Sequence, residues 1–107
     1  MSGFDEREKG FEKKFEHDQE LAFKTKARRN RLLGAWAAKQ LGLSGAEAEA
    51  YAKEIIEIDL QRNGDDHVVD KLVTDFAAKG VKYDAARVRQ ELTRFTQEAR
   101  KLLGITN

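Results

Sequence analysis

The 107-residue chain contains no proline, and most of its eight glycines stand apart between stretches rich in Ala, Leu, Glu, Lys, Arg and Gln. These residues favour helices, whereas proline is the residue that most strongly interrupts one. The length suits one small domain with a single core. We therefore predict an all-α protein and exclude an enzyme core built on a β-sheet.

The first two predicted helices have clear start and stop signals. Helical periodicity runs over residues 21–41, and Gly42 offers a left-handed C-terminal cap. Ser44 and Glu47 have the spacing of a capping box, in which the two side chains satisfy free amide groups at a helix start. The second helix is therefore expected to start at Ser44 and to end at the Asn-Gly pair 63–64.

The third and fourth predicted helices follow after equally short connections. Asp65 or Asp66 can cap the third, which ends at Gly80, and Asp84 can cap the fourth. Apolar side chains recur at three- and four-residue spacing in all four segments, so each helix has one face to bury. Short connections favour antiparallel neighbours, and the predicted fold is a small antiparallel four-helix bundle. The predicted core is Leu33, Trp36, Ala37, Leu41, Ala48, Tyr51, Ala52, Ile55, Ile58, Val69, Leu72, Val73, Phe76, Ala85, Val88, Leu92, Phe95, Ala99 and Leu102.

The N-terminal segment differs from the rest of the chain. Its large apolar side chains are Phe4, Phe11 and Phe15, which would share one narrow stripe on a helix. Such a segment has too little apolar surface to pack firmly on its own bundle, but three rings can anchor it to a partner. We predict that residues 1–19 form a mobile, partly helical tail that becomes a helix on binding, and that residues 20–107 form the bundle domain.

Charge is segregated along the chain although the formal net charge is only +1. Residues 1–20 carry seven acidic and four basic side chains, and residues 21–40 carry six basic and no acidic ones. The balance reverses to seven acidic and two basic over 41–66, then to eight basic and five acidic over 67–107. Such blocks can attract one another within a bundle or face different partners, and a uniform surface for nucleic acid is not expected.

Catalytic and metal-binding motifs are absent from the sequence. There is no cysteine, and the chain shows no nucleotide-binding glycine loop, no HExxH motif and no serine nucleophile elbow. We predict no enzymatic activity, no cofactor and no metal site. The carboxylate pairs 65–66 and Glu54 with Glu57 are expected to be solvated. His17 is also expected to be solvated without a specific role, although its position between an acidic and a basic segment would let its protonation affect binding. His67 is expected to be structural.

The densest basic run could contact phosphates or a protein partner. Because no aromatic residue is interleaved and acidic segments flank the run, a solvated or partner-facing helix is favoured over nucleic-acid binding. Trp36 is expected to lie in the core, although a pocket for an adenine nucleotide, with Trp36 and Lys39 as contacts, stays open. The run comprises Lys24, Lys26, Arg28, Arg29 and Arg31.

No segment has the character of a membrane anchor or an export signal. The longest apolar stretches are far shorter than the roughly 20 residues of a spanning helix. The N-terminus is acidic and lacks an apolar signal core. We therefore predict an unexported protein that does not insert into the membrane directly.

Several runs of the sequence together resemble one known family. They are FDEREKGFE at 4–12, ELAFK at 20–24 and ARRNRLLG at 27–34, with Lys14-Phe15 and His17-Asp18 between them. This combination is similar to the zeta-subunit family of alphaproteobacterial F-type ATP synthases. The glycine breaks of the remainder fit the same family over essentially the whole chain.

The resemblance implies an inhibitor of ATP hydrolysis whose N-terminal segment inserts at a catalytic subunit interface. Its partners would be the catalytic head and the central stalk, and it would be cytoplasmic, peripheral to the inner membrane through the ATP synthase. Phe4, Phe11 and Phe15 would be buried anchors. The other contacts expected in the tail are Asp5, Glu6, Arg7, Glu8, Lys9, Glu12, Lys13, Lys14 and His17, and those expected on the basic helix are Lys24, Arg28, Arg29 and Arg31.

Two alternatives remain at the level of the sequence. One is a non-inhibitory adaptor or assembly factor of the same complex, in which the bundle binds and the tail does little. The other is a small module that binds an adenine nucleotide weakly.

Overall fold

The computed structural model describes the backbone of residues 2–62 and 64–105 and the side chains of residues 17–62 and 64–105. Over these residues it contains no strand and four helices, which confirms the predicted all-α fold. The helices are α1 (Ser2–Gln40), α2 (Gly45–Gln61), α3 (Asp66–Ala78) and α4 (Ala85–Leu102).

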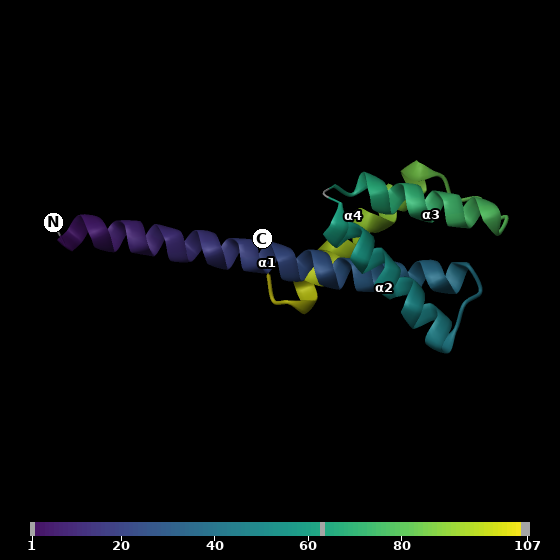
Figure 1. Cartoon of the computed structure of the whole chain (residues 1–107), viewed down its shortest axis with the longest axis horizontal. Coiled ribbons are helices and arrows are strands. Elements are labelled where there is room, and N and C mark those ends of the chain that lie inside the picture. Colours follow the sequence, from purple (N-terminus) through teal and green to yellow (C-terminus); the bar gives the residue numbers. More distant parts are fainter. Residues whose placement is uncertain (1, 63, 106–107) are drawn as a thin grey trace.

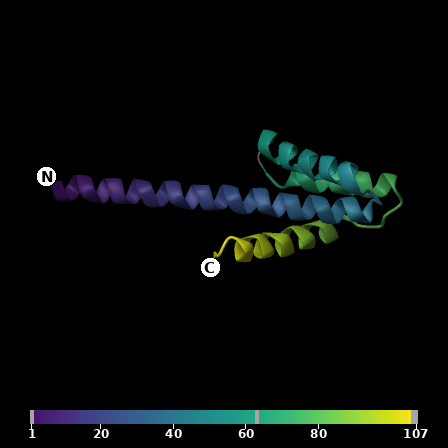
Figure 2. The ribbon, with the colours of Figure 1, turned by 90° about the horizontal axis from the view of Figure 1, so that it is seen from below.

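The C-terminal half of α1 is the axis of the bundle. In Figure 2, α2 and α3 lie on one side of α1 and α4 lies on the other. Successive helices run in opposite directions, as the short connections require, so the bundle is antiparallel. The N-terminal half of α1 projects beyond the other three helices (Figure 1), and the whole chain measures 65 × 23 × 23 Å.

Helix α1 crosses the predicted boundary between residues 1–19 and 20–107 without a break. A groove between α1 and α4 is lined on α1 by residues between Asp18 and Arg29, with Ile105 also among its lining residues. Residues 17–20 are exposed, and burial on α1 begins with the partly buried Leu21. The division into a mobile tail and a bundle domain stays a prediction.

The core forms from the predicted apolar faces. Fully buried side chains come from every helix and include Leu33, Ile55, Leu72 and Phe76. The prediction was wrong at both ends of α4, where Ala85 is exposed and Leu102 is 59% exposed. The reason is that periodicity identifies a face but does not show where the neighbouring helices stop covering it. Periodicity also missed the fully buried Val68 and Ala38.

The three predicted helix starts are realised in different ways. Asp84 caps α4 as predicted, since its carboxylate accepts a hydrogen bond from the amide of Arg87 at 2.9 Å. Ser44 occupies the N-cap of α2, but its hydroxyl makes no capping hydrogen bond, so the capping box was wrong. The next residue, Gly45, has a φ of +58°, in the left-handed region, whereas the first residue of a helix ordinarily has a negative φ. Asp65 precedes α3, but its carboxylate is used elsewhere in the fold.

Two glycines of the α1–α2 region have clear structural reasons. At Gly34, a Cβ atom would come within 2.7 Å of the Cα atom of Ala52, so only glycine lets α1 and α2 approach this closely. Gly42 has a φ of +80° and lies two residues after Gln40, the last residue of α1. There the amide of Leu43 donates to the carbonyl of Ala38 at 2.8 Å, a Schellman-type cap that confirms the predicted stop.

Two leucines of α4 provide a matched test of the core. Leu92→Ala is expected to lower the free energy of unfolding by about 2–5 kcal/mol, because Leu92 is almost fully buried and the change leaves a cavity. Leu102→Ala makes the same change at an exposed position and is expected to cost less than about 0.5 kcal/mol. Urea unfolding measures both, and equal losses would contradict the assigned core.

Candidate functional site

The six basic side chains of α1 between residues 24 and 39 divide into two sets. Lys26 and Arg29 turn toward the other helices and interact with their carboxylates. The other four follow one another at spacings of four, three and eight residues, which places them on a single face of α1. They are Lys24, Arg28, Arg31 and Lys39.

Arg29 is at the centre of the inward set. Its guanidinium donates hydrogen bonds to the two carboxylate oxygens of Asp65 at 2.9 and 3.2 Å, and it lies 3.5 Å from Asp59. It also donates to the amide oxygen of its neighbour Asn30. Because Asp65 is engaged in this way, its carboxylate does not cap α3. Arg29 was expected to contact a partner. It is only 6% exposed, so its side chain stabilises the fold instead.

Asp59 completes the buried cluster from the side of α2. One of its carboxylate oxygens accepts a hydrogen bond from the amide nitrogen of Asn30 at 2.7 Å. The other has no hydrogen bond but lies 3.4 Å from the ammonium group of Lys26. The cluster of Lys26, Arg29, Asn30, Asp59 and Asp65 therefore ties the middle of α1 to the end of α2 and the start of α3.

The outward set is almost free of internal partners. Lys24 forms an exposed ion pair with Glu20 at 3.0 Å, one turn away on the same helix. Among the residues that the structure describes, Arg28, Arg31 and Lys39 form no ion pair, and all three are exposed. We call Lys24, Arg28, Arg31 and Lys39 the basic face of α1.

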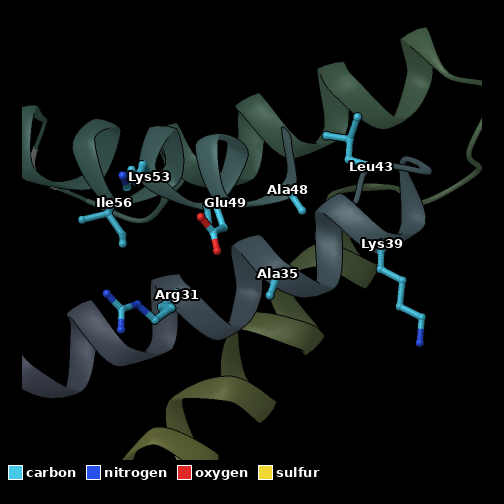
Figure 3. Close-up of a pocket in the computed structure, with 9 residues that line it drawn as sticks. Arg31, Ala35, Lys39, Leu43, Ala48, Glu49, Lys53 and Ile56 are labelled. Atoms are coloured by element: carbon cyan, nitrogen blue, oxygen red, sulfur yellow. The ribbon is translucent and has the colours of Figure 1, made fainter. Parts of the chain in front are cut away.

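A groove of about 630 Å³ runs beside the basic face, between α1 and α2. Figure 3 shows Arg31, Ala35 and Lys39 on α1 opposite residues of α2. Its floor is made by small and apolar side chains, and Arg31, Lys39, Lys53 and Glu49 stand around it. The apolar lining residues are Ala35, Leu43, Ala48, Ala52 and Ile56.

The contribution of α2 to this groove was missed at the level of the sequence. Lys53 and Ile56 carry no motif of their own. The pairing of Gly34 with Ala52 is the signal that could have found them, because two small residues facing each other bring α1 and α2 close together. The residues beside that contact on each helix then line one groove.

Trp36 belongs to the core side of α1 rather than to this groove. Its ring stacks on Tyr83 with ring centroids 5.6 Å apart and meets the edge of Phe76 at the same distance. It is partly buried against the core, as expected. Lys39 lines the groove and Trp36 does not, so the structure does not bring the two predicted nucleotide contacts together there.

The carboxylates expected to be solvated are mostly paired between helices. Asp66 accepts a hydrogen bond from Arg89 of α4 at 2.6 Å, which lowers the pKa of the Asp66 carboxyl. Glu54 lies 3.1 Å from Lys71 of α3. These pairs hold neighbouring helices together and are exposed at one partner or both, so each contributes little to stability.

The expected tail contacts lie largely outside the described side chains. Residues 2–16 are placed in α1 by their backbone alone. His17 is described and is exposed on α1. The contacts outside the described side chains are Phe4, Asp5, Glu6, Arg7, Glu8, Lys9, Phe11, Glu12, Lys13, Lys14 and Phe15.

Comparison with known proteins identifies the family of this bundle. The family described as ATPase inhibitor subunit zeta matches residues 1–102. The chain belongs to this zeta family. The match spans both the projecting half of α1 and the four-helix bundle, and it confirms the resemblance seen in the sequence.

A solved structure shares the zeta-family fold seen in this chain. A protein whose structure was determined by solution NMR is 37% identical, with a TM-score of 0.68. The match covers 78% of this chain and 94% of that one. The search of curated proteins found no match.

Membership of the zeta family assigns the chain to inhibitor subunits of an ATPase, which are regulatory rather than catalytic. No helix in the part of the chain that the structure describes is long and apolar enough to cross a membrane.

The two neighbouring arginines of α1 give a test of the buried cluster. Arg29→Met is expected to lower the free energy of unfolding by about 3 kcal/mol, because it leaves Asp59 and Asp65 without their shared cation. Arg28→Met removes an exposed and unpaired charge and is expected to change stability by less than about 0.5 kcal/mol. Similar unfolding midpoints for the two variants would show that the cluster contributes little.

Proposed function

We propose that this zeta-family chain inhibits ATP hydrolysis by an F-type ATP synthase by inserting residues 2–19 at a catalytic interface, while its bundle stays outside. The partners would be the catalytic head and the central stalk, which would place the chain at the cytoplasmic side of the inner membrane without insertion into it. The observation that carries the proposal is the projection of α1 beyond the bundle, in a chain of the inhibitor family (Figure 1).

The dimensions of the chain suit entry by the tail alone. At about 1.5 Å per residue, residues 2–19 of a helix span about 27 Å, and a single helix is about 10 Å wide. The chain is 23 Å across in both short directions, and where α1 projects alone it has the width of one helix. A cleft wide enough for one helix would therefore admit the projecting half of α1 and stop at the bundle.

The three phenylalanines supply the anchoring surface in this proposal. Phe11 follows Phe4 by seven residues and precedes Phe15 by four, spacings that share one face of a helix. Large side chains in desolvated pockets carry most of the free energy of many interfaces. The surrounding acidic and basic residues would orient the segment and raise its rate of encounter.

Replacement of the anchors tests the proposal. The triple variant Phe4→Ala, Phe11→Ala and Phe15→Ala is expected to abolish inhibition of ATP hydrolysis by the purified cognate enzyme, with little change in helical content by circular dichroism. Phe23→Ala is the matched control, since Phe23 is exposed on the same helix outside the proposed segment.

The outcomes separate the proposal from its rival. Inhibition retained by the triple variant would contradict the role of the phenylalanines as anchors. A chain without residues 1–19 shows whether the bundle binds alone. If neither the full chain nor this shorter chain inhibits while both bind, the chain is an adaptor and not an inserting inhibitor.

The free tail is expected to be the least protected part of α1. Residues 2–16 project past the bundle, whereas the stretch around Leu33 and Ala37 is buried among the other helices. Short helices without tertiary contacts are only marginally stable in water. Amide hydrogen exchange measured by NMR should therefore be fast over residues 2–16 and slow over residues 30–38, and the tail signals should be sharp and poorly dispersed. Equal protection along α1 would contradict a mobile tail.

A further inference from the structure

We propose that the groove between α1 and α2 is a second docking surface, which binds an acidic amphipathic helix of the ATPase. This inference rests on the proposed function only in taking the F-type enzyme as the partner. It assigns to the bundle a contact of its own, separate from the insertion of the tail.

The unpaired cations are the first observation. Most basic side chains of the bundle that face other helices are matched by a carboxylate, as Arg29 is by Asp65 and Arg89 by Asp66. Around this groove, Arg31, Lys39 and Lys53 form no ion pair within the described residues. These three cations outnumber the single carboxylate of Glu49 around the groove, so the rim is positive and would attract an acidic surface.

The shape of the surface favours a helix over a small anion. The basic face extends from Lys24 to Lys39, which on a helix corresponds to about 22 Å, or four turns. The cations therefore lie in a row and do not converge on one point. No buried polar side chain lines the groove, so it has no built site for a single phosphate. Glu49 is the one acidic residue against three cations among the lining residues of the groove.

The floor of the groove supplies the apolar half of the recognition. Ala35, Ala48 and Ala52 are small and leave the hollow open, while Leu43 and Ile56 add apolar contact area. An amphipathic helix that lies in a groove buries an apolar stripe and keeps its charged flank at the rim. Here an acidic flank would lie along Arg31 and Lys39 (Figure 3).

The groove is placed where it can act together with the tail. Lys39 is 20 residues beyond the end of the tail, a separation of about 30 Å along α1. Two contacts at this separation would engage different parts of a large partner. Because they are linked covalently, each would slow the loss of the other.

The test uses the full chain, the purified cognate F-type enzyme and variants of matched charge. The groove variant is Arg31→Glu, Lys39→Glu and Lys53→Glu. The control, Lys79→Glu, Lys82→Glu and Lys101→Glu, makes the same total change at three exposed cations away from the groove that form no ion pair within the described residues. The groove variant is expected to associate at least about tenfold more slowly at low salt, with a weaker salt dependence, whereas the control stays within about twofold of the natural chain.

A second variant separates the shape of the groove from its charge. Ala35→Arg fills the hollow at an exposed position while it adds a positive charge, so electrostatic attraction is not reduced. Because the partner helix would no longer fit, the variant is expected to bind more weakly through faster dissociation. Binding as tight as that of the natural chain would overturn the proposal. An equal loss for the groove variant and its control would also overturn it, because the effect would then follow net charge alone.

The remaining outcomes distinguish this proposal from the one on which it rests. If the triple phenylalanine variant still inhibits while the groove variant associates slowly, insertion of the tail fails and the docking surface stands. ADP can also be titrated into the natural chain and the groove variant, with NMR chemical shifts as the readout. If the groove variant no longer responds to ADP but associates with the enzyme at the normal rate, the groove binds a nucleotide and the proposal is overturned. Failure of the natural chain to bind the enzyme overturns both.

Discussion

The buried guanidinium of Arg29 is the interaction on which the arrangement of the helices depends. It joins α1 to carboxylates from the end of α2 and the start of α3. A charge removed from water is tolerated only when it is paired and hydrogen-bonded. The guanidinium of Arg29 therefore meets its carboxylates at only one position of α1 along its axis relative to α2 and α3. The close contact between Gly34 and Ala52 then fixes how near α2 lies. Together these contacts determine where α1 leaves the bundle and in which direction.

The same cluster determines which charges remain available to a partner. Lys26 pairs with Asp59 and Arg29 pairs with Asp65, so neither cation is available to a partner. The cations that α1 does not need for folding all lie on its basic face, beside a groove with an apolar floor. The segregation of charge along the sequence therefore has two results in the fold: an attraction between helices and a one-sided positive surface.

Much of the fold could be predicted from the sequence because local signals agree with tertiary packing. The spacing of Leu33 and Ala37, or of Val88 and Leu92, identifies buried faces, and Gly42 marks the end of α1 correctly. The sequence could not distinguish Arg28 from Arg29, since two adjacent arginines differ only by a rotation of about 100° about a helix whose neighbours are not yet placed. For the same reason, the family resemblance predicted the tail as the inhibitory segment, but the groove was missed. Its two sides come from different helices, and the two small residues that bring them together, Gly34 and Ala52, are 18 positions apart in the sequence.

The unbroken course of α1 has a consequence for how sequences of this kind can vary. In a helix, each added residue advances the chain by about 1.5 Å and turns it by about 100°. One residue inserted near position 20 would therefore rotate the face that carries Phe4, Phe11 and Phe15 by more than a quarter turn relative to the basic face. Seven residues would restore its orientation to within about 20° but move it outward by about 10 Å. A flexible linker would absorb such a change in length, whereas a continuous helix converts it into a rotation of the tail relative to the bundle. The number of residues between tail and bundle therefore determines which way the phenylalanines face.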